Sequence, residues 1–446
     1  MSTRSRLRLA SIPAAVWFAA AACSVAPDPT GHAARPPDGA LDELRALDAA
    51  RNYFALRDRV AAMPDATAPE VQYFQAVVHH AFNDPARSNV VAAALLARPS
   101  TLPESTVFEL QRLELRNHLR LFEYSAAAAK TAAILEAPPV SAKVSDLSEL
   151  RNLLRIFRAL QDVPAQQISS RRATRLRPDG GRIPITIEST TRQFVFDTGA
   201  NLSVLMRSEA ERLGLQIREA GVEVGTVTDL RPTADLAIAA RLEIGGVELR
   251  NVVFLVMPDE LLSFPDGHRI PGIVGFPVIE ALGEVVFGAD GTIEIPETPA
   301  DGGTANLALA GLKLLTLVGH RNSRFICQFD TGADATDFYA PFFKAHEADV
   351  TQVGTLTTLR STGVGGTREF DGYRLPRLEV TVAGRALTLL DVDVYAAPVR
   401  EEEYLHCNIG QDVLRQVNGY RLNFRSMTLT FGDEAHDPRP PRLDLH

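Results

Sequence analysis

The stretch Phe196-Asp197-Thr198-Gly199-Ala200 occurs a second time in this chain, as Phe329-Asp330-Thr331-Gly332-Ala333. An apolar pair precedes each copy, Phe194-Val195 in the first and Phe325-Ile326 in the second. An apolar run that ends at Asp and Gly is typical of a strand that leads into a tight turn. The sequence therefore predicts two similar strands, each with an aspartate at its carboxyl end.

The sequence around each pentapeptide repeats as well. Gly275 ends an apolar-apolar-Gly segment 78 residues after Asp197 (275 − 197), and Gly410 ends its counterpart 80 residues after Asp330 (410 − 330). Each copy also predicts two strands joined by a Gly turn and a closing hairpin, at 242–244, 252–256 and 285–295 in the first copy and at 378–380, 389–395 and 420–431 in the second. Such a repeat indicates an internal duplication.

Both units resemble the bacterial retropepsin-like aspartyl protease domain of clan AA, here in tandem and with the two-lobed logic of pepsins. The resemblance covers roughly Thr174 to Asp433. It implies a mainly β fold with two acid-protease β-barrel lobes, at 170–298 and 303–434, and a short tail at 435–446. It also implies that Asp197 and Asp330 are the catalytic residues of an aspartic-type endopeptidase, which acts on polypeptides and needs no cofactor and no metal.

The implied mechanism follows from charge. Two carboxylates about 3 Å apart cannot both ionise cheaply, so an aspartic protease pair keeps one proton over its working range. One member then takes a proton from a bound water while the other protonates the peptide carbonyl oxygen. The sequence leaves open which aspartate is the acid.

The resemblance implies supporting roles for the rest of each loop. Thr198 and Thr331 are expected to brace the two loops against each other by hydrogen bonds. Gly199 and Gly332 are expected to let the backbone turn tightly beside the carboxylates.

The resemblance further implies a Gly-bearing hairpin, the flap, over the substrate. The second unit offers Gly363, Gly365 and Gly366 for this hairpin, whereas the first offers only Gly225. In the retroviral members of the family that these units resemble, the residue after Asp-Thr-Gly-Ala is usually acidic and helps to hold the substrate backbone. Asp334 fits this pattern in the second unit, but the first unit has Asn201, so the lobes have diverged.

Two other interpretations remain open. In one, the protease fold is catalytically silent and the chain is a membrane-anchored scaffold or binding protein. In the other, each lobe pairs with its twin on a second chain, as in a homodimer of single-lobe enzymes. A tandem arrangement favours pairing within one chain because the linker gives the second lobe a high effective concentration.

The amino terminus has the layout of a bacterial secretory signal. Three arginines, Arg4, Arg6 and Arg8, precede an apolar run that ends at Ala22, and Cys23 follows. This pattern predicts a signal peptide at 1–22 and a lipoprotein tether at 23–38, with Cys23 as the lipidation site; the alternative is an ordinary signal peptide. We therefore expect an extracytoplasmic lipoprotein that meets the membrane through its lipid, on the periplasmic side of the outer membrane if the cell is Gram-negative.

A helical region is predicted before the protease units, at 39–165. Apolar residues fall at helical spacing over 41–63, 71–82, 90–96, 107–122 and 126–135. Successive helices of this kind resemble a tetratricopeptide-type array, which could hold a protein partner, although such stripes are more often packing core. The arginine-rich segment from Gln166 to Arg177 is predicted to be a solvated link.

Two cysteines remain after Cys23. Cys327 lies three residues before Asp330, and Cys407 lies three residues before Gly410. The resemblance places both on neighbouring strands of one lobe, where they could form a disulfide bond in an oxidising compartment. Two buried thiols that act as small apolar side chains are the alternative.

The composition of the chain argues against two classes of binding partner. The formal net charge is −9, no basic stripe is present, and the cysteines lack the spacing of a zinc site. We therefore expect no nucleic-acid partner and no structural metal.

Overall fold

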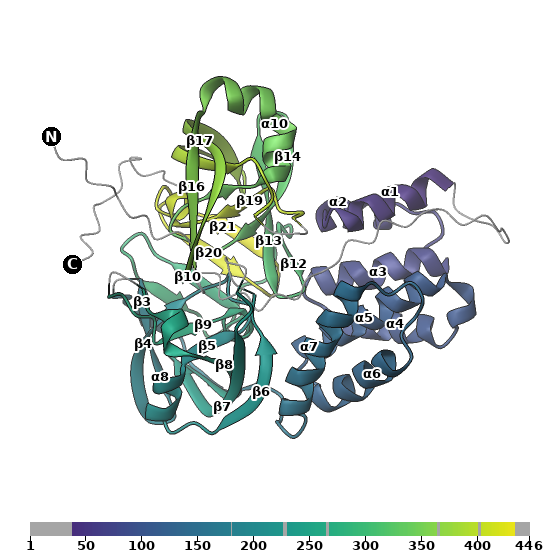
Figure 1. Cartoon of the computed structure of the whole chain (residues 1–446), viewed down its shortest axis with the longest axis horizontal. Helices are drawn as coiled ribbons and strands as arrows, with labels where there is room; N and C mark the ends of the chain where they lie inside the picture. The colour runs from purple at the N-terminus through teal and green to yellow at the C-terminus, as the bar shows by residue number, and fades with distance from the viewer. Residues whose placement is uncertain are drawn as a thin grey trace. The chain divides into compact units, whose positions relative to one another are not determined.

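The computed structural model describes residues 38–179, 181–225, 230–264, 267–363, 366–399 and 403–432. Several predicted features lie outside these residues, namely the signal peptide, Cys23, Gly365 and the tail at 435–446. The described chain divides into two compact units (Figure 1). One holds the residues up to Gln166 together with Ala305–Gly311, and the other holds Gln167–Thr304 and the residues from Leu312 onward.

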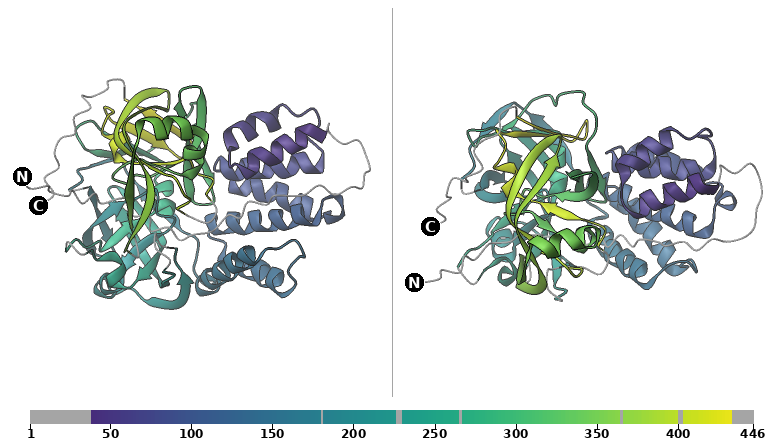
Figure 2. Two further views of the ribbon diagram at one scale, coloured as in Figure 1. Left: turned by 45° about the horizontal axis from the view of Figure 1, so that its top comes forward. Right: turned by 90° about the horizontal axis from the view of Figure 1, so that it is seen from above.

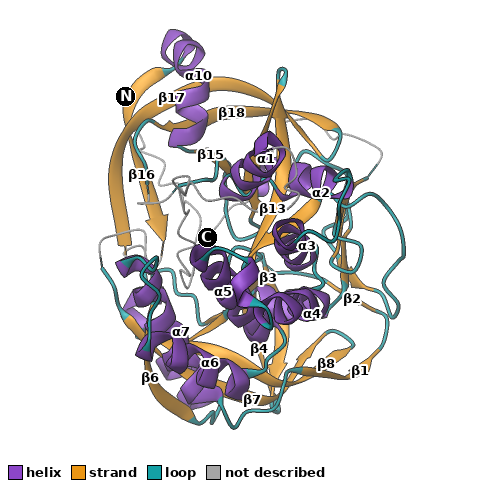
Figure 3. Cartoon of the chain, turned by 90° about the vertical axis from the view of Figure 1, so that its right-hand side faces the viewer, coloured by secondary structure: helices purple, strands orange, loops and turns teal. Residues whose placement is uncertain are grey.

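The first unit is helical, and each helix packs against the next along the chain (Figures 1 and 3). Its helices are α1 (Asp38–Ala49), α2 (Tyr53–Ala61), α3 (Pro69–Ala81), α4 (Pro85–Leu96), the 3₁₀ turn η1 (Pro99–Thr101), α5 (Glu104–Arg120), α6 (Tyr124–Glu136) and α7 (Val144–Leu160). None of the described helices is long and apolar enough to cross a membrane. The short strand β12 (Leu307–Ala310) falls within the residues grouped with this unit.

Two helix predictions need correction. The single helix predicted over 41–63 is two helices, because Arg51 has a φ of 53° and the Asn52 side chain accepts a hydrogen bond from Ala55 N at 3.2 Å. The side-chain bond of Asn52 caps the start of α2, and the left-handed backbone of Arg51 separates α2 from α1. The prediction also missed α7, whose apolar face includes the buried residues Leu150 and Phe157.

A buried charge cluster joins α5 to α7. The Arg112 side chain lies 2.9 Å from Glu109, 3.0 Å from Asp146 and 2.5 Å from Glu149. Only 2% of Arg112 is exposed. A buried guanidinium needs such partners, because removal of a partner from a buried ion pair lowers the free energy of unfolding by about 3–5 kcal/mol.

The second unit contains two β lobes. The first consists of β1 (Gln167–Arg171), β2 (Thr174–Leu176), β3 (Arg182–Ile187), β4 (Thr190–Phe196), β5 (Ser203–Met206), α8 (Arg207–Arg212), β6 (Ile217–Glu223), β7 (Thr233–Ile244), β8 (Val247–Met257), η2 (Asp259–Leu262), β9 (Gly272–Val274), α9 (Phe276–Ala281), β10 (Glu284–Phe287) and β11 (Ile293–Ile295). Strand β7 pairs with both β3 and β8, so the order β8-β5-β9-β4-β3-β7 closes into a ring.

The second lobe repeats this order. It consists of β13 (Lys313–His320), β14 (Ser323–Phe329), β15 (Asp337–Phe338), α10 (Ala340–Val353), β16 (Thr355–Gly363), β17 (Gly366–Val382), β18 (Arg385–Tyr395), β19 (Cys407–Ile409), α11 (Gln411–Leu414), β20 (Tyr420–Asn423) and β21 (Thr428–Phe431). Strand β17 pairs with β13 and β18, so β18-β15-β19-β14-β13-β17 closes into an equivalent ring. Figure 2 shows the strands of this lobe in green to yellow. Each lobe is thus a small β-barrel whose core is filled from all its strands.

A separate sheet connects the two lobes. Its order is β2-β11-β10-β20-β21, and its centre is the antiparallel pair of β10 from the first lobe with β20 from the second. Phe287 and Tyr420 are register partners in this pair, and their rings stack with centroids 4.2 Å apart. The two closing hairpins predicted from the sequence therefore join in one continuous sheet.

The segment at 166–177, predicted to be a solvated link, is largely exposed, but most of it forms strands, so it is not a link. Strand β1 pairs with β8, and β2 pairs with β11. The Arg171 guanidinium donates hydrogen bonds to the carbonyl oxygens of Ala281 and Leu282, at 2.9 and 2.8 Å, where α9 ends. A cation that satisfies the last carbonyls of a helix is favourable, so arginines here build the lobe edge instead of a linker.

Candidate active site

Each Asp-Thr-Gly loop begins where a central barrel strand ends. Strand β4 runs parallel to β9, and the Asp197 N–H donates to the carbonyl of Val274 at 3.1 Å. In the second lobe β14 runs parallel to β19, and the Asp330 N–H donates to the carbonyl of Ile409 at 3.0 Å. The segments that end at Gly275 and Gly410 thus fix the backbone of each aspartate in the same way.

Aromatic side chains support both loops from the connecting sheet. Phe196, just before the first aspartate, packs edge-on against Phe287 with centroids 5.7 Å apart. Phe329, just before the second aspartate, packs edge-on against Tyr420 with ring centroids 6.2 Å apart. Since Phe287 and Tyr420 stack on each other, one row of rings spans both lobes and fixes the loops relative to each other.

The two threonines cross between the loops. The Thr198 N–H donates to Thr331 Oγ1 at 3.1 Å, and the Thr331 N–H donates to Thr198 Oγ1 at 3.0 Å. Each hydroxyl also donates across to the opposite strand, from Thr198 to the carbonyl of Phe329 at 2.9 Å and from Thr331 to that of Phe196 at 3.0 Å. All four bonds are buried, so they join the lobes at the point where the aspartates lie.

Replacing Thr198 by Val should therefore destabilise the protein strongly. The change leaves the carbonyl of Phe329 and the N–H of Thr331 buried without their partner, at about 1–3 kcal/mol for each group. We expect the free energy of unfolding in urea to fall by about 2–6 kcal/mol. Thr198→Ser keeps the hydroxyl and is the matched control; equal stability of the Val and Ser variants would contradict this prediction.

Glycine lets each loop approach the opposite carboxyl group. A Cβ atom on Gly199 would lie 2.5 Å from Asp330 Cγ, and one on Gly332 would lie 2.4 Å from Asp197 Cγ. Both distances are far below van der Waals contact, so no larger residue fits at either position. The N–H groups of these glycines also donate to the Oδ1 atom of the aspartate in their own loop, at 2.7 and 2.9 Å.

The structure places Asp197 and Asp330 together in one chain, with 0% and 1% of each residue exposed. Their carboxyl groups are close enough to share a hydrogen bond. Burial, followed by the charge of Asp330, raises the pKa of Asp197 well above its ordinary value. Burial also raises the pKa of Asp330, but hydrogen bonds from neighbouring groups oppose that rise. The pair therefore retains a proton at pH values where free aspartates are ionised.

This retained proton gives a sign for the pH dependence of stability. The folded protein binds the proton more tightly than the unfolded chain, so the contribution of the pair is fully present below the ordinary aspartate pKa of about 3.9 and is lost as pH rises through the raised folded value. We expect Asp197→Asn to become more stable relative to the unchanged protein as pH rises toward neutral. Thermal unfolding of both proteins over this pH range measures the difference, and a constant difference would contradict it.

One polar partner of the pair was not predicted from the sequence. Asn408 Nδ2 donates to Asp330 Oδ2 at 2.8 Å, from strand β19. The sequence did contain a signal, because the polar Asn408 stands where the counterpart segment of the first lobe, Ile273-Val274-Gly275, has an apolar residue.

The other predicted binding residues lie in different surroundings. Asn201 is buried, with 2% exposed, whereas Asp334 lies at the surface in an ion pair with Arg415 at 2.7 Å. Gly363 and Gly366 face each other across the β16–β17 hairpin. Gly225 follows β6, which pairs with β7 in the equivalent hairpin of the first lobe. Both lobes thus have a hairpin at the predicted position, and its action as a flap stays a prediction.

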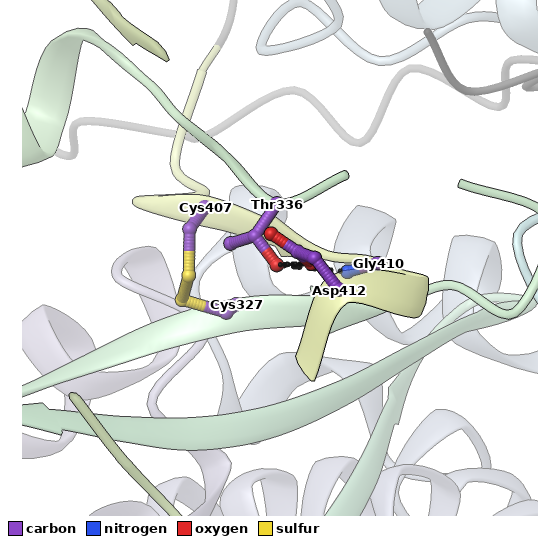
Figure 4. The surroundings of a disulfide bond; sticks show 5 residues. All are labelled: Cys327, Thr336, Cys407, Gly410 and Asp412. Carbon is purple, nitrogen blue, oxygen red and sulfur yellow. Dashed lines mark hydrogen bonds between the residues drawn. A yellow bond between two sulfur atoms is a disulfide. The ribbon is translucent and has the colours of Figure 1, made fainter. Parts of the chain in front are cut away.

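Cys327 and Cys407 form a disulfide bond with their Cα atoms 4.7 Å apart (Figure 4). They are register partners on the parallel strands β14 and β19, and both are fully buried. Beside them, Thr336 Oγ1 accepts from the Gly410 N–H at 3.1 Å and donates to Asp412 Oδ1 at 2.6 Å (Figure 4). The segments on either side of the second aspartate are thereby tied together covalently and by hydrogen bonds.

A comparison with known protein families matches one of the two lobes. A family model described as Aspartyl protease matches residues 183–278, which include Asp197 and Gly275. No curated protein matches the chain at a significant level. The chain therefore contains an aspartic protease-like domain.

Solved structures are similar to parts of the chain. Basic 7S globulin from soybean shares 9% identity, over 59% of this chain and 95% of that one, with a TM-score of 0.37. A retropepsin-like aspartic protease from Rickettsia conorii shares 14% identity, over 29% of this chain and 92% of that one, with a TM-score of 0.22.

Within the described residues, no cluster of His, Cys, Asp and Glu side chains could hold a metal ion.

Proposed function

We propose that this protein is an aspartic endopeptidase whose two catalytic carboxyl groups come from tandem lobes of one chain. One observation carries the proposal: Asp197 and Asp330 are both buried, and each carboxyl group lies against the glycine of the opposite loop, on loops that the crossed threonine bonds join. The family match supports the first lobe. The second lobe enters the proposal because it has the same closed strand order and the same loop sequence.

The pair suits activation of a water molecule. The ionised carboxylate takes a proton from water as the water oxygen bonds to the peptide carbonyl carbon, and the protonated carboxyl group gives its proton to the carbonyl oxygen. The resulting diol then collapses as the C–N bond breaks. The carboxyl group that took the proton of water gives it to the leaving nitrogen, and the other carboxylate takes a proton from a diol hydroxyl. Each step uses only the two carboxyl groups and water, and the substrate would be an extended polypeptide.

Digestion of a diverse peptide pool by the full chain, over acidic to neutral pH, tests the proposal. We expect cleavage that an aspartic-protease transition-state analogue suppresses, because such analogues bind the paired carboxyl groups far more tightly than substrates do. The cut sites would also define the specificity. A folded protein that cuts no peptide at any pH would leave the silent scaffold as the better interpretation.

We further propose that the protein works outside the cytoplasm as a lipoprotein anchored through Cys23. The amino-terminal sequence supports this location. The disulfide bond supports it independently, because structural disulfides persist mainly in oxidising compartments. Radiolabelled palmitate incorporation that is lost in Cys23→Ala would support the anchor, and equal labelling of both proteins would exclude it.

The helical unit is proposed to hold a protein partner or a protein substrate in the manner of a tetratricopeptide-type array. A surface cavity of about 400 Å³ lies between α4, α5 and α6, lined by Leu96, Val107, Ile134 and the ion-paired Glu114 and Lys130. Val107→Lys should then raise KM for protein substrates and leave short peptides unaffected. Equal KM values for both substrate classes would argue that these helices only pack.

A further inference from the structure

The hydrogen bonds to the two catalytic carboxyl groups are unequal. Asp330 receives one bond at each oxygen, from the Gly332 N–H at 2.9 Å and from Asn408 Nδ2 at 2.8 Å. Asp197 Oδ1 accepts from the Gly199 N–H at 2.7 Å, but no described residue donates to its Oδ2 atom. That oxygen is therefore left for the proton that the pair shares.

The inequality arises from one pair of equivalent positions. Asn408 precedes Gly410 by two residues, and Ile273 precedes Gly275 by two residues. The strand register is also equivalent, since Phe329 pairs with Ile409 and Phe196 pairs with Val274. An isoleucine side chain has no donor, so the first lobe cannot give Asp197 the bond that Asn408 gives Asp330.

We propose that Asn408 is a positioning residue that holds the negative charge of the pair on Asp330, so that Asp330 is the general base and Asp197 the general acid. The catalytic roles rest on the proposed function, whereas the placement of the charge does not. An amide N–H bond stabilises an ionised carboxylate about twice as well as a neutral group, which favours ionisation of the aspartate that receives it. The proton then lies on Asp197 Oδ2, directed to the neighbouring carboxylate.

Other charges near the pair leave this asymmetry in place. Asp337 is the register partner of Asn408 on β15, and Asp412 on α11 bonds to Thr336. Neither group is among the main influences on the pKa of Asp197 or Asp330, and no cationic side chain is among them. After burial, the bond from Asn408 is the strongest influence on the pKa of Asp330, and it lowers that pKa.

A measurement that does not need activity tests the placement of the charge. Asn408→Ile, which copies the first lobe, is introduced into Asp197→Asn, where Asp330 is the only titrating member of the pair, and into Asp330→Asn as the matched control. We expect the loss in Tm caused by Asn408→Ile to grow with pH in the Asp197→Asn background and to stay constant in the Asp330→Asn background. A loss that is independent of pH in both backgrounds would show that Asn408 only packs, and would overturn the proposal.

The pH profile of peptide hydrolysis tests the catalytic consequence. In the pH profile of kcat/KM, Asn408→Ile should shift the acidic limb to higher pH by roughly one to two units. This shift is the equivalent of one hydrogen bond to a charged group. The double variant Ile273→Asn/Asn408→Ile, which moves the donor to the first lobe, should move the limb back. A uniform loss of kcat/KM with unmoved limbs would overturn the assignment of base and acid. If no protein in the series cuts peptides while the Tm pattern holds, the proposed function fails and the placement of the charge stands.

Discussion

Replacement of either Asp197 or Asp330 by Asn is expected to lower kcat/KM for peptide hydrolysis by at least about 10³-fold, because each aspartate supplies one half of the proton transfer. An Asn at either position keeps the shape of the side chain but can neither take up the proton of water nor deliver one. Both variants should stay folded, since the loops remain joined through Thr198 and Thr331. Initial rates on the best peptide of the pool, with circular dichroism on the same samples, provide the measurement.

Asp301→Asn is the matched control for this prediction. Asp301 is exposed and forms an ion pair with Arg425 at 3.3 Å. Surface ion pairs contribute only about 0–1 kcal/mol, so its loss should change hydrolysis little compared with loss of a paired aspartate. If all three Asn variants retain full activity, the peptidase interpretation is excluded and the scaffold interpretation remains.

The same two variants decide between pairing within one chain and pairing between chains. Because both carboxyl groups meet within one chain in this structure, a mixture of Asp197→Asn with Asp330→Asn should stay inactive. Recovery of about a quarter or more of the original rate on mixing would instead favour lobes that exchange between chains.

The sequence was informative where chemistry restricts the residue type. Paired carboxyl groups require Asp197 and Asp330, and close approach of the loops requires Gly199 and Gly332, because a Cβ atom there would overlap the opposite carboxyl group. These residues can therefore be read from a short pattern. The repeated frame of apolar strands was equally readable because each barrel strand has to bury one face.

The sequence was less informative where a polar side chain has several possible partners. Arg171 could equally have faced solvent, and only the tertiary structure brings the last carbonyls of α9 to its guanidinium. Asn408 was passed over for the same reason, since its effect depends on one hydrogen bond between neighbouring strands. The break at Arg51 was also hidden, because a single left-handed residue leaves the apolar spacing of α1 and α2 almost continuous.

The disulfide bond leads to the second large expected effect, on stability. It links residues 80 positions apart, so the chain-entropy relation gives a stabilisation of about 4.5 kcal/mol at 25 °C. We expect the double variant Cys327→Ala/Cys407→Ala to lose about that amount in urea unfolding. Alanine is used because a serine hydroxyl at these fully buried positions would need a new partner.

Reduction provides the control for this effect. A thiol reductant should lower the unfolding midpoint of the unchanged protein toward that of the double variant and leave the double variant unaffected. Activity should fall together with stability, because Cys327 lies three residues before Asp330 and Cys407 directly precedes Asn408. Loosening β14 from β19 would therefore disturb the bond between Asn408 and Asp330, and the acidic limb of hydrolysis should shift upward on reduction, as it should in Asn408→Ile. Two free thiols at these positions in the non-reduced protein, found by peptide mapping, would contradict both expectations.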